Sequence, residues 1–408
     1  MSANPIRGPR NLSVEDARAR MLARAAPLPA ETTPLAEADG RTLAETVTAI
    51  RDQPPFDASA MDGWAVKRAD VGEAVSLTIV GESAAGRGYE PTLQSGEALR
   101  IFTGAPVPAG ADLVIIQENA ERDGDVVRLG PAGEGSANIR ARGGDFRAGT
   151  VLLEAGTRLD PWRLSLAAAA GRAHLQVARL PRIAVLATGE ELAAPGSEAG
   201  PFQIYESGSA GLLPMIRRWG GAPERLARTG DDAAAIAEAV RNIDVDVIVT
   251  VGGASVGDYD LVKPALATLG LELDVETVNI RPGKPTWFGR LAANSSGGGR
   301  LVLGLPGNPA SAFVCAELFL KPLVLALQGV TRPFGLDTAR LAEPLPANGP
   351  REHWMRARLR PDGVSAFPDQ DSSLVTVFAA ADALLRRLPG APAVAVGGSV
   401  DILRLDRG

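Results

Sequence analysis

The stretch Val245-Asp-Val-Ile-Val-Thr-Val251 is nearly all apolar and β-branched, and Gly252-Gly253 follows it directly. Two similar runs, 182–187 and 301–305, precede and follow it along the chain. Amphipathic segments that we predict as helices lie between and after these runs, near residues 208–219, 232–241 and 259–269 and from residue 309 onward. Buried strands that alternate with such helices are typical of a mostly parallel sheet covered on both faces. Residues 181–331 are therefore predicted to form an α/β domain.

The sequence on both sides of this domain has a different pattern. From residue 47 to 143, short β-like runs are divided by Gly and Pro turns, which predicts a small β-rich domain. Residues 144–180 contain turns and one predicted helix, and another helix is expected to begin after Ser13, which is a suitable capping residue. Residues 332–408 again consist of short predicted strands and turns. The chain is therefore expected to contain several domains.

Length and composition argue against several classes of protein. The chain has 408 residues, of which 45% are hydrophobic and 22% are charged, as in an ordinary globular protein of more than one domain. Its net charge of −6 argues against nucleic-acid binding, because counterion release requires a strongly basic surface. No stretch approaches the roughly 18 uninterrupted apolar residues of a membrane span, and residues 1–10 lack the apolar core of a signal peptide. We therefore predict a cytoplasmic protein that binds neither nucleic acid nor a membrane.

Cysteine and histidine are scarce. The chain contains one cysteine, Cys315, and two histidines, His174 and His353. Cys315 lies in an apolar run and is interpreted as a small buried residue, and neither histidine is expected to take part in chemistry. Zinc sites and Cys–His nucleophile pairs are therefore not expected within one chain. The chemistry must rest on carboxylates, hydroxyls, backbone amides and cations.

Polar loops follow the predicted strands at the edge where open α/β sheets bind ligands. The glycines of the loop 252–260 would let the backbone turn tightly and offer amide hydrogens to an anion. Asp258 and Asp260 could simply cap the helix that follows. Alternatively, Asp260 could hold Mg²⁺ against a phosphate together with Glu191 and Asp231, which belong to neighbouring loops.

The segment Arg281-Pro-Gly-Lys-Pro285 places two cations on one tight turn. We interpret it as an anion clamp, because a merely solvated turn does not require this rigidity. Asn308-Pro309 is typical of a helix start, with Asn as the cap and Pro in the first helical position. Ser311 on that first turn could present a hydroxyl to the same site. The residues alone therefore predict an anionic, phosphorylated ligand together with Mg²⁺.

Seven longer motifs extend this prediction. They are SAMDGWA (59–65), RIFTGAPVPAGAD (100–112), GGDFRAG (143–149), ATGEEL (187–192), GGASVGDYD (252–260), RPGKP (281–285) and GLPGNPASA (304–312). With these motifs in this order, the sequence resembles the MoeA family, the molybdopterin molybdenumtransferases of molybdenum cofactor biosynthesis. The resemblance covers nearly the whole chain.

The resemblance implies a chain of four parts. These are an elongated N-terminal linker domain (1–46 and 144–180), the inserted β-rich domain (47–143), an α/β molybdopterin-binding domain (181–331) and a C-terminal β-barrel-like domain (332–408). It also implies a homodimer whose active site lies between the α/β domain of one subunit and the N-terminal parts of the other. The implied reaction is Mg²⁺-dependent: it takes adenylylated molybdopterin and molybdate, transfers molybdenum to the pterin dithiolene and releases AMP. Other molybdenum cofactor enzymes are implied as further partners.

Residues at the motif positions carry implied roles. Asp62, Thr103 and Asp145 would line the cleft from the N-terminal side. Glu191, Asp231 and Asp260 would serve Mg²⁺ and the phosphoanhydride. The residues implied to bind molybdate or the pterin nucleotide are Gly252, Gly253, Ser255, Gly257, Lys263, Arg281, Lys284, Ser311, Arg356 and Ser372, of which Lys284 is also counted as catalytic.

Some alternatives stay open. Gly208 follows Ser207 where the family pattern has Asn, and Asp371 stands where glycine is usual, so Ser373 is an alternative to Ser372. Two rival functions also remain: a molybdopterin adenylyltransferase, which would resemble the α/β domain alone, and a scaffolding protein that has kept the fold. The long N-terminal half argues against the first rival, and the intact anion-binding motifs argue against the second.

Overall fold

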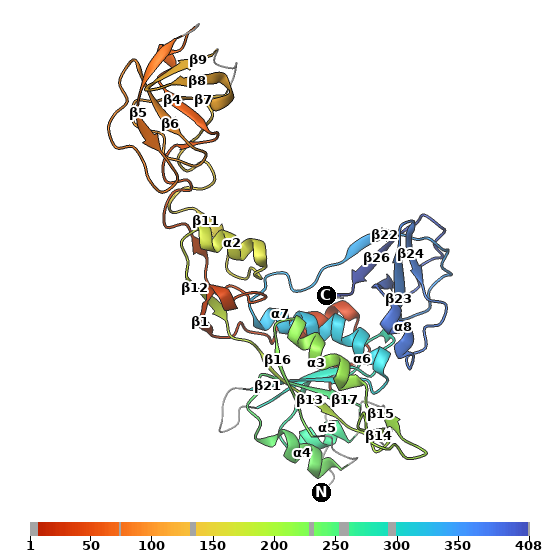
Figure 1. The fold of residues 1–408 in the computed structure, drawn as a ribbon. Helices are drawn as coiled ribbons and strands as arrows, with labels where there is room; N and C mark the ends of the chain where they lie inside the picture. Colours follow the sequence, from red (N-terminus) through yellow and green to blue (C-terminus); the bar gives the residue numbers. More distant parts are fainter. Residues whose placement is uncertain are drawn as a thin grey trace.

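The computed structural model describes residues 7–72, 75–130, 136–227, 232–252, 261–292 and 299–406. They form an elongated molecule in which a long arm rises from a broader body (Figure 1). The tip of the arm carries the β-rich strands, and the body combines the central sheet with the C-terminal strands.

The body is built on a six-stranded sheet. In spatial order, its strands are β16 (Ala222–Arg225), β13 (Arg182–Ala187), β17 (Val247–Val251), β21 (Arg300–Leu305), β20 (Trp287–Leu291) and β18 (Glu272–Val275). The first four are parallel to one another, whereas β20 and β18 add an antiparallel edge that we did not predict. Every residue of β17 is buried, as expected for a strand covered on both faces. The predicted α/β domain with a mostly parallel sheet is confirmed.

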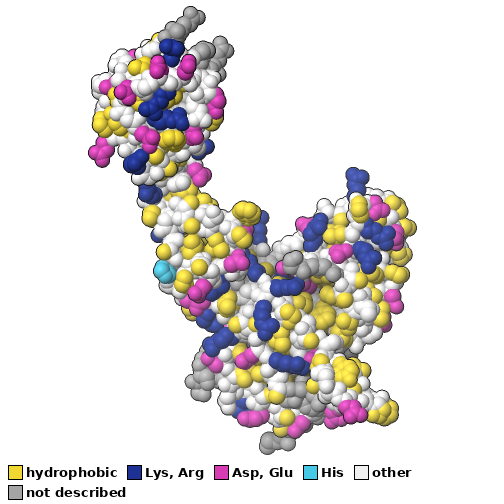
Figure 2. All heavy atoms as spheres, in the orientation of Figure 1, with side chains coloured by type: hydrophobic (Ala, Val, Ile, Leu, Met, Phe, Trp, Pro, Cys, Tyr) yellow, Lys and Arg dark blue, Asp and Glu magenta, His cyan; other side chains and the backbone are white. Residues whose placement is uncertain are grey.

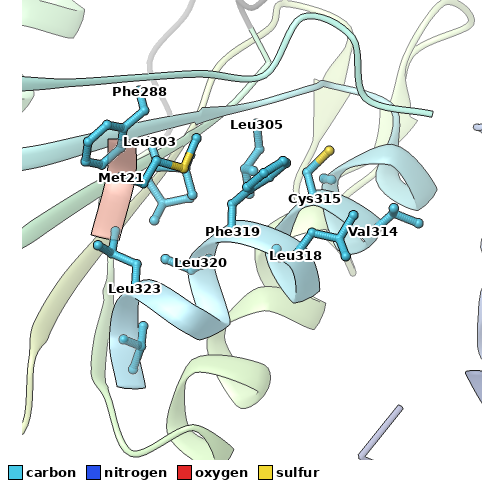
Figure 3. Packing of buried hydrophobic residues seen from close by; sticks show 14 of the residues in the cluster. Met21, Phe288, Leu303, Leu305, Val314, Cys315, Leu318, Phe319, Leu320 and Leu323 are labelled. Atoms are coloured by element: carbon cyan, nitrogen blue, oxygen red, sulfur yellow. The ribbon is translucent and has the colours of Figure 1, made fainter. Parts of the chain in front are cut away.

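Helices cover both faces of this sheet (Figure 1). One face carries α3 (Gly208–Arg218), α6 (Pro309–Cys315) and α7 (Lys321–Leu327), the last two joined by a π-helical turn, Ala316–Leu320. The opposite face carries α4 (Ala233–Arg241) and α5 (Val262–Ala267). In Figure 3, Phe319 points from the helices toward Leu305 of the sheet. A short pair, β14 (Leu192–Ala193) and β15 (Ile204–Tyr205), stands beside the loop that follows β13.

The N-terminal helix α1 (Val14–Leu22) also packs into this core, although we assigned residues 1–46 to the linker domain. Met21 is fully buried, and Figure 3 shows it beside Leu303 of the central sheet. The first part of the chain is thus anchored on the α/β domain before it enters the arm.

One helical stretch, Pro309–Leu327, is long and apolar enough to cross a membrane by length and composition alone. Sequence analysis did not single it out because Glu317 and Lys321 interrupt the apolar run. In the structure, 83% of this stretch is buried inside the protein, where it forms the helical layer over the central sheet. We therefore assign it to the core of the body.

The stem of the arm is made from two distant parts of the chain. β1 (Ala30–Pro34) pairs antiparallel with β12 (His174–Ala178), and β2 (Val47–Thr48) pairs with β11 (Val151–Leu153). Helix α2 (Pro161–Ala169) belongs to the same small core, and the carboxylate of Asp160 caps its first turn. The chain therefore leaves through the stem into the β-rich domain and returns beside its own outgoing strands.

The tip of the arm is a second six-stranded sheet. In spatial order, its strands are β7 (Leu113–Ile116), β4 (Gly63–Val66), β6 (Glu97–Ile101), β5 (Ser76–Ser83), β9 (Val126–Leu129) and β8 (Ala120–Asp123). Apolar side chains including Trp64, Leu99 and Ile115 fill its two small cores. A short pair, β3 (Ala58–Ser59) and β10 (Ile139–Arg140), and three 3₁₀ turns, Leu35–Glu37, Arg68–Asp70 and Gln117–Asn119, complete the N-terminal half.

The C-terminal strands form a curved sheet. Its path runs β19 (Ile280–Arg281), β23 (Glu352–Arg360), β25 (Ala383–Arg387), β26 (Ser399–Arg404) and β22 (Asp337–Arg340), with β24 (Gly363–Ala366) also paired to β23 and α8 (Val375–Ala380) beside it. A bridge joins Leu341, directly after β22, to Val364 of β24, so the sheet curves toward the predicted barrel-like form. Strand β19 comes from the α/β part of the chain and joins this sheet by parallel pairing with β23.

Leu320 tests the position of the core, since its side chain is 0% exposed between the helical layer and the sheet. We predict that Leu320→Ala lowers the free energy of unfolding by about 2–5 kcal/mol, because the lost carbons leave a cavity. The matched control is Leu388→Ala, since Leu388 is 49% exposed. It should change stability by less than about 0.5 kcal/mol in chemical denaturation. Equal losses in the two variants would contradict this core assignment.

Candidate functional site

A cavity of about 1010 Å³ lies between the α/β domain and the C-terminal sheet. The α/β domain contributes the loops after β13, β17 and β21, which is the carboxyl edge where sequence analysis placed a ligand. The C-terminal part contributes residues of β23 and the loop 368–372. The predicted site residues that line the cavity are Glu191, Gly252, Arg281, Lys284, Ser311 and Ser372.

The turn that carries Arg281 and Lys284, called the basic turn from here on, is held in place by contacts on its buried side. Gly283 has φ +112°, which favours glycine, and a Cβ at this position would clash with the sulfur of Cys315. The Thr286 hydroxyl donates to the carbonyl of Gly283 at 2.7 Å. Neither cation forms an ion pair within the described part of the chain, so both charges remain available to an anion in the cavity.

Cys315 is buried beneath this turn, as predicted for a small core residue. Burial raises the pKa of its thiol to about 12, so the sulfur is protonated at neutral pH. A buried thiol in this state is a poor metal ligand. Apart from the thioether of Met355, the cavity therefore offers oxygen and nitrogen groups, and the nearby thiol of Cys315 serves packing.

Two serines also line the cavity, Ser311 and Ser372. Asn308 connects the two segments: its amide nitrogen donates to the hydroxyl of Ser372 at 2.8 Å. We predicted a side-chain cap from Asn308, and this was wrong, because the residue occupies the cap position of α6 but its side chain makes no capping bond. Ser373 instead donates to the carboxylate of Asp371 at 2.6 Å, which leaves Ser372 as the serine that faces the cavity.

Arg356 lies directly behind the lining residues and is 0% exposed. Its guanidinium donates to the carbonyl of Asp371 at 2.8 Å, and Gln370 bonds its backbone in both directions. Nε and Nη1 of Arg356 have no hydrogen-bond partner among the described residues. Burial, together with nearby Arg281, lowers the pKa of Arg356, while Asp369 and Asp371 raise it. A guanidinium keeps its proton even so. Arg356 is therefore a buried positive charge whose Nε and Nη1 donors are unused within the described part of the chain.

Part of the cavity wall was not predicted from the sequence. Arg351, directly before β23, adds another cation, His353 of β23 adds a buried imidazole, and Asp369 adds a carboxylate. Burial first, and then the arginines around it, lower the pKa of His353 to about 4, so it is neutral at pH 7. No local motif could have marked Arg351 and His353, because the pairing of β23 with β19 brings them to the site.

Of the three predicted carboxylates, only Glu191 is among the residues that the structure describes. Glu191 is exposed at the cavity, but Asp231 and Asp260 lie outside the described residues, as do Gly253, Ser255, Gly257 and Asp258. Among the described residues, no group of three or more His, Cys, Asp or Glu side chains is placed to hold a metal ion. Lys263 lies on α5, which covers the other face of the sheet, and does not line this cavity.

Asp62 and Thr103 meet at the tip of the arm. One carboxylate oxygen of Asp62 accepts bonds from the backbone nitrogen of Thr103 at 2.7 Å and from its hydroxyl at 2.8 Å. These two bonds lower the pKa of Asp62, so the carboxylate is charged at neutral pH. Asp145 is exposed between β10 and β11, and its amide nitrogen donates to the carbonyl of Gln53 at 3.0 Å. Asp62 directly precedes β4 and Thr103 follows β6, and Figure 1 shows these two strands apart from β23, which contributes to the cavity.

Comparison with known proteins defines the class. Residues 184–326 match the family described as a probable molybdopterin binding domain. Residues 12–171 match the MoeA N-terminal region (domain I and II), and residues 338–405 match the MoeA C-terminal region (domain IV). The cavity therefore lies between the part that matches the probable molybdopterin binding domain and the part that matches the MoeA C-terminal region.

The chain belongs to the MoeA family, and the resemblance stated from its motifs is confirmed. It is 34% identical over 342 residues to the molybdopterin molybdenumtransferase of Nostoc sp., covering 81% of this chain and 77% of that protein. The corresponding protein of Synechococcus elongatus is 37% identical over 366 residues, covering 85% and 87%.

Solved structures support the same family assignment. Two crystal structures of the molybdopterin biosynthesis MoeA protein from Pyrococcus horikoshii have TM-scores of 0.81 and 0.82 against this chain, at 30% and 26% identity. They cover 97% of this chain and 99% and 100% of theirs. The match extends over the arm as well as the body, which confirms the predicted multidomain fold.

Gly283 tests the shape of the basic turn. We predict that Gly283→Ala destabilises the protein by about 1–3 kcal/mol and weakens binding of a tetrahedral oxyanion, because the added methyl meets the sulfur of Cys315 at a positive φ. Gly335→Ala is the matched control, since a Cβ there meets no atom within 4 Å. Thermal unfolding and sulfate titration measure the two effects. Unchanged sulfate affinity in Gly283→Ala would show that the anion does not depend on this turn.

Proposed function

We propose that this protein inserts molybdenum from molybdate into adenylylated molybdopterin and releases AMP. The observation that supports this most is the composition of the cavity: the cations Arg281 and Lys284 line it together with Ser311 and Ser372. Molybdate is a hard oxyanion, and cations and hydroxyls are the groups that bind one. The relatives named molybdopterin molybdenumtransferase support the same assignment.

The role of the chain in this proposal is to hold and neutralise the oxyanion. Arg281 and Lys284 would supply exposed cations, and the hydroxyls of Ser311 and Ser372 would donate hydrogen bonds to the anion. Arg356 adds a fixed positive charge behind Ser372. The lasting sulfur ligands of molybdenum would come from the dithiolene of the substrate, because Cys315 is buried and protonated. Preorganised charges of this kind stabilise developing negative charge without rearranging during the reaction.

We also propose that the reaction depends on Mg²⁺. Carboxylate oxygen is the ligand that Mg²⁺ prefers, and Glu191 lies at the cavity beside the carboxyl ends of the strands. Asp231 and Asp260 are proposed to complete its ligands from the neighbouring loops. When bound, Mg²⁺ would act as a Lewis acid on the phosphoanhydride. The amides of the glycine loop, from Gly252 onward through Gly253, Ser255 and Gly257, and Lys263 are proposed to serve the pterin nucleotide.

The working unit in this proposal is a homodimer. Asp62 and Thr103 adjoin β4 and β6, which lie apart from the cavity-lining β23 of the same chain in Figure 1, and Asp145 lies between β10 and β11. A second subunit would bring these residues to the cleft. We further propose a cytoplasmic location, no binding to nucleic acid or membranes, and encounters with other molybdenum cofactor enzymes that receive the product. The whole-chain family match counts against a molybdopterin adenylyltransferase, which would resemble the α/β domain alone.

The function can be tested by measuring AMP release from adenylylated molybdopterin, with and without molybdate. We expect release by the wild-type protein to require molybdate and to fall about 10²–10³-fold in Lys284→Ala, since a charge that contacts the transition state is lost. Arg290→Ala is the control, because Arg290 is an exposed cation that pairs with Glu272 on β18. AMP release without any response to molybdate, or full activity in Lys284→Ala, would refute the assignment.

The shared active site can be tested by mixing two inactive variants, Asp62→Ala and Lys284→Ala. If each site combines the arm of one subunit with the cavity of the other, mixed dimers contain one intact site. Random reassociation of equal amounts should then restore up to about a quarter of wild-type activity. Size-exclusion chromatography checks that the mixture is dimeric. No recovery in a mixture that has exchanged subunits would mean that each site is built within a single chain.

A further inference from the structure

His353 lines the cavity and has no role in the proposed function. It is 7% exposed, lines the cavity, and has no hydrogen-bond partner for Nε2 within the described part of the chain. An unpartnered polar atom in a buried position costs free energy unless a ligand or water satisfies it. Nε2 can therefore form a hydrogen bond with a group that enters the cavity.

Positive charges surround His353 on each strand packed against it. In the strand pairing, Arg281 of β19 is its partner on one side and Arg387 of β25 on the other. Arg356 lies on its own strand, β23, and Arg351 directly precedes that strand. Burial and these four arginines together keep the imidazole neutral at pH 7. The other charged groups of the cavity wall are Lys284, Glu191, Asp369 and Asp371.

We propose that His353 is a proton-linked part of the oxyanion site: it is neutral while the cavity is free and takes up one proton when a dianion binds beside it. This inference rests on the proposed function, because that function places molybdate in the cavity beside the basic turn and the two serines. Burial is the main reason that the imidazole is neutral, and repulsion by the arginines adds to it. Two negative charges near the arginine cluster would offset this repulsion and favour the protonated imidazole. Once protonated, both ring nitrogens are donors, so Nε2 gains a bond to the anion.

Proton uptake by His353 would make the site prefer dianions to monoanions. A dianion supplies enough negative potential to hold the extra proton, whereas a monoanion of the same shape supplies about half of it. The site should therefore favour molybdate over a tetrahedral monoanion such as perrhenate. The preference should grow as the pH falls, because proton uptake accompanies only the binding of the dianion.

The test is calorimetric titration of the full-length protein with molybdate and with perrhenate, at about pH 6 and about pH 8, the range in which histidine charge is most easily shifted. Repeating each titration in two buffers of different protonation enthalpy counts the protons taken up. We expect close to one proton with molybdate and close to none with perrhenate. The affinity ratio of molybdate to perrhenate should rise by up to about tenfold per pH unit as the pH falls.

Two variants complete the experiment. His353→Gln keeps a polar side chain that cannot titrate, and we expect its affinity ratio to be independent of pH. His174→Gln is the matched control, because the only other histidine of the chain is exposed on β12, and it should behave as wild type. If His353→Gln failed to fold, the comparison of the two anions on wild-type protein would still decide the question.

The outcomes separate this inference from the function beneath it. Equal proton uptake with the two anions, or uptake that survives in His353→Gln, would overturn the role of His353 while leaving the oxyanion site in place. Failure of the wild-type protein to bind either anion would overturn the oxyanion site itself, and this inference with it.

Discussion

The pairing of β19 with β23 is the interaction on which the rest of the site depends. Ile280 and Arg281 run parallel to Glu352 and His353, and the backbone nitrogen of Glu352 donates to the carbonyl of Asn279 at 3.1 Å. A segment of the α/β domain thereby becomes the edge strand of the C-terminal sheet. Backbone hydrogen bonds, rather than side-chain contacts alone, then fix the basic turn against β23. Neither domain could form the cavity by itself, since each supplies only one part of its wall.

The charges in this cavity are arranged before any ligand arrives. Holding Arg356 fully buried costs free energy, because its guanidinium loses water and only part of its donor capacity is satisfied. The carbonyl of Asp371 and the nearby carboxylates offset part of this cost. The remaining donors and the exposed cations of the turn create a positive potential that an oxyanion can satisfy. The scarcity of cysteine and histidine fits this design, because a site that hands its metal to a sulfur-bearing substrate should not bind that metal tightly itself.

Much of the fold follows from local sequence, and the gaps have physical reasons. The strands β13, β17 and β21 were predictable because burial on both faces demands uninterrupted apolar residues, and Pro282 with Gly283 marked the basic turn. Strand β19 has only two residues, so it leaves no periodic signal, and its pairing with β23 could not be foreseen. Arg351 and His353 were missed for the same reason. Asn308 was predicted as a local cap, but its side chain bonds Ser372, a contact over 64 positions that no local rule reveals. The roles of Asp62, Thr103 and Asp145 came from family resemblance alone and stay predictions.

The most direct test of this account is a crystal structure with tungstate, a heavier oxyanion of the same shape and charge as molybdate. Anomalous scattering from tungsten locates the anion without reference to the protein. We expect one strong peak in the cavity, next to the cations Arg281 and Lys284 and the hydroxyls of Ser311 and Ser372. An ordered tungsten peak elsewhere on the molecule, with none beside the basic turn, would contradict it.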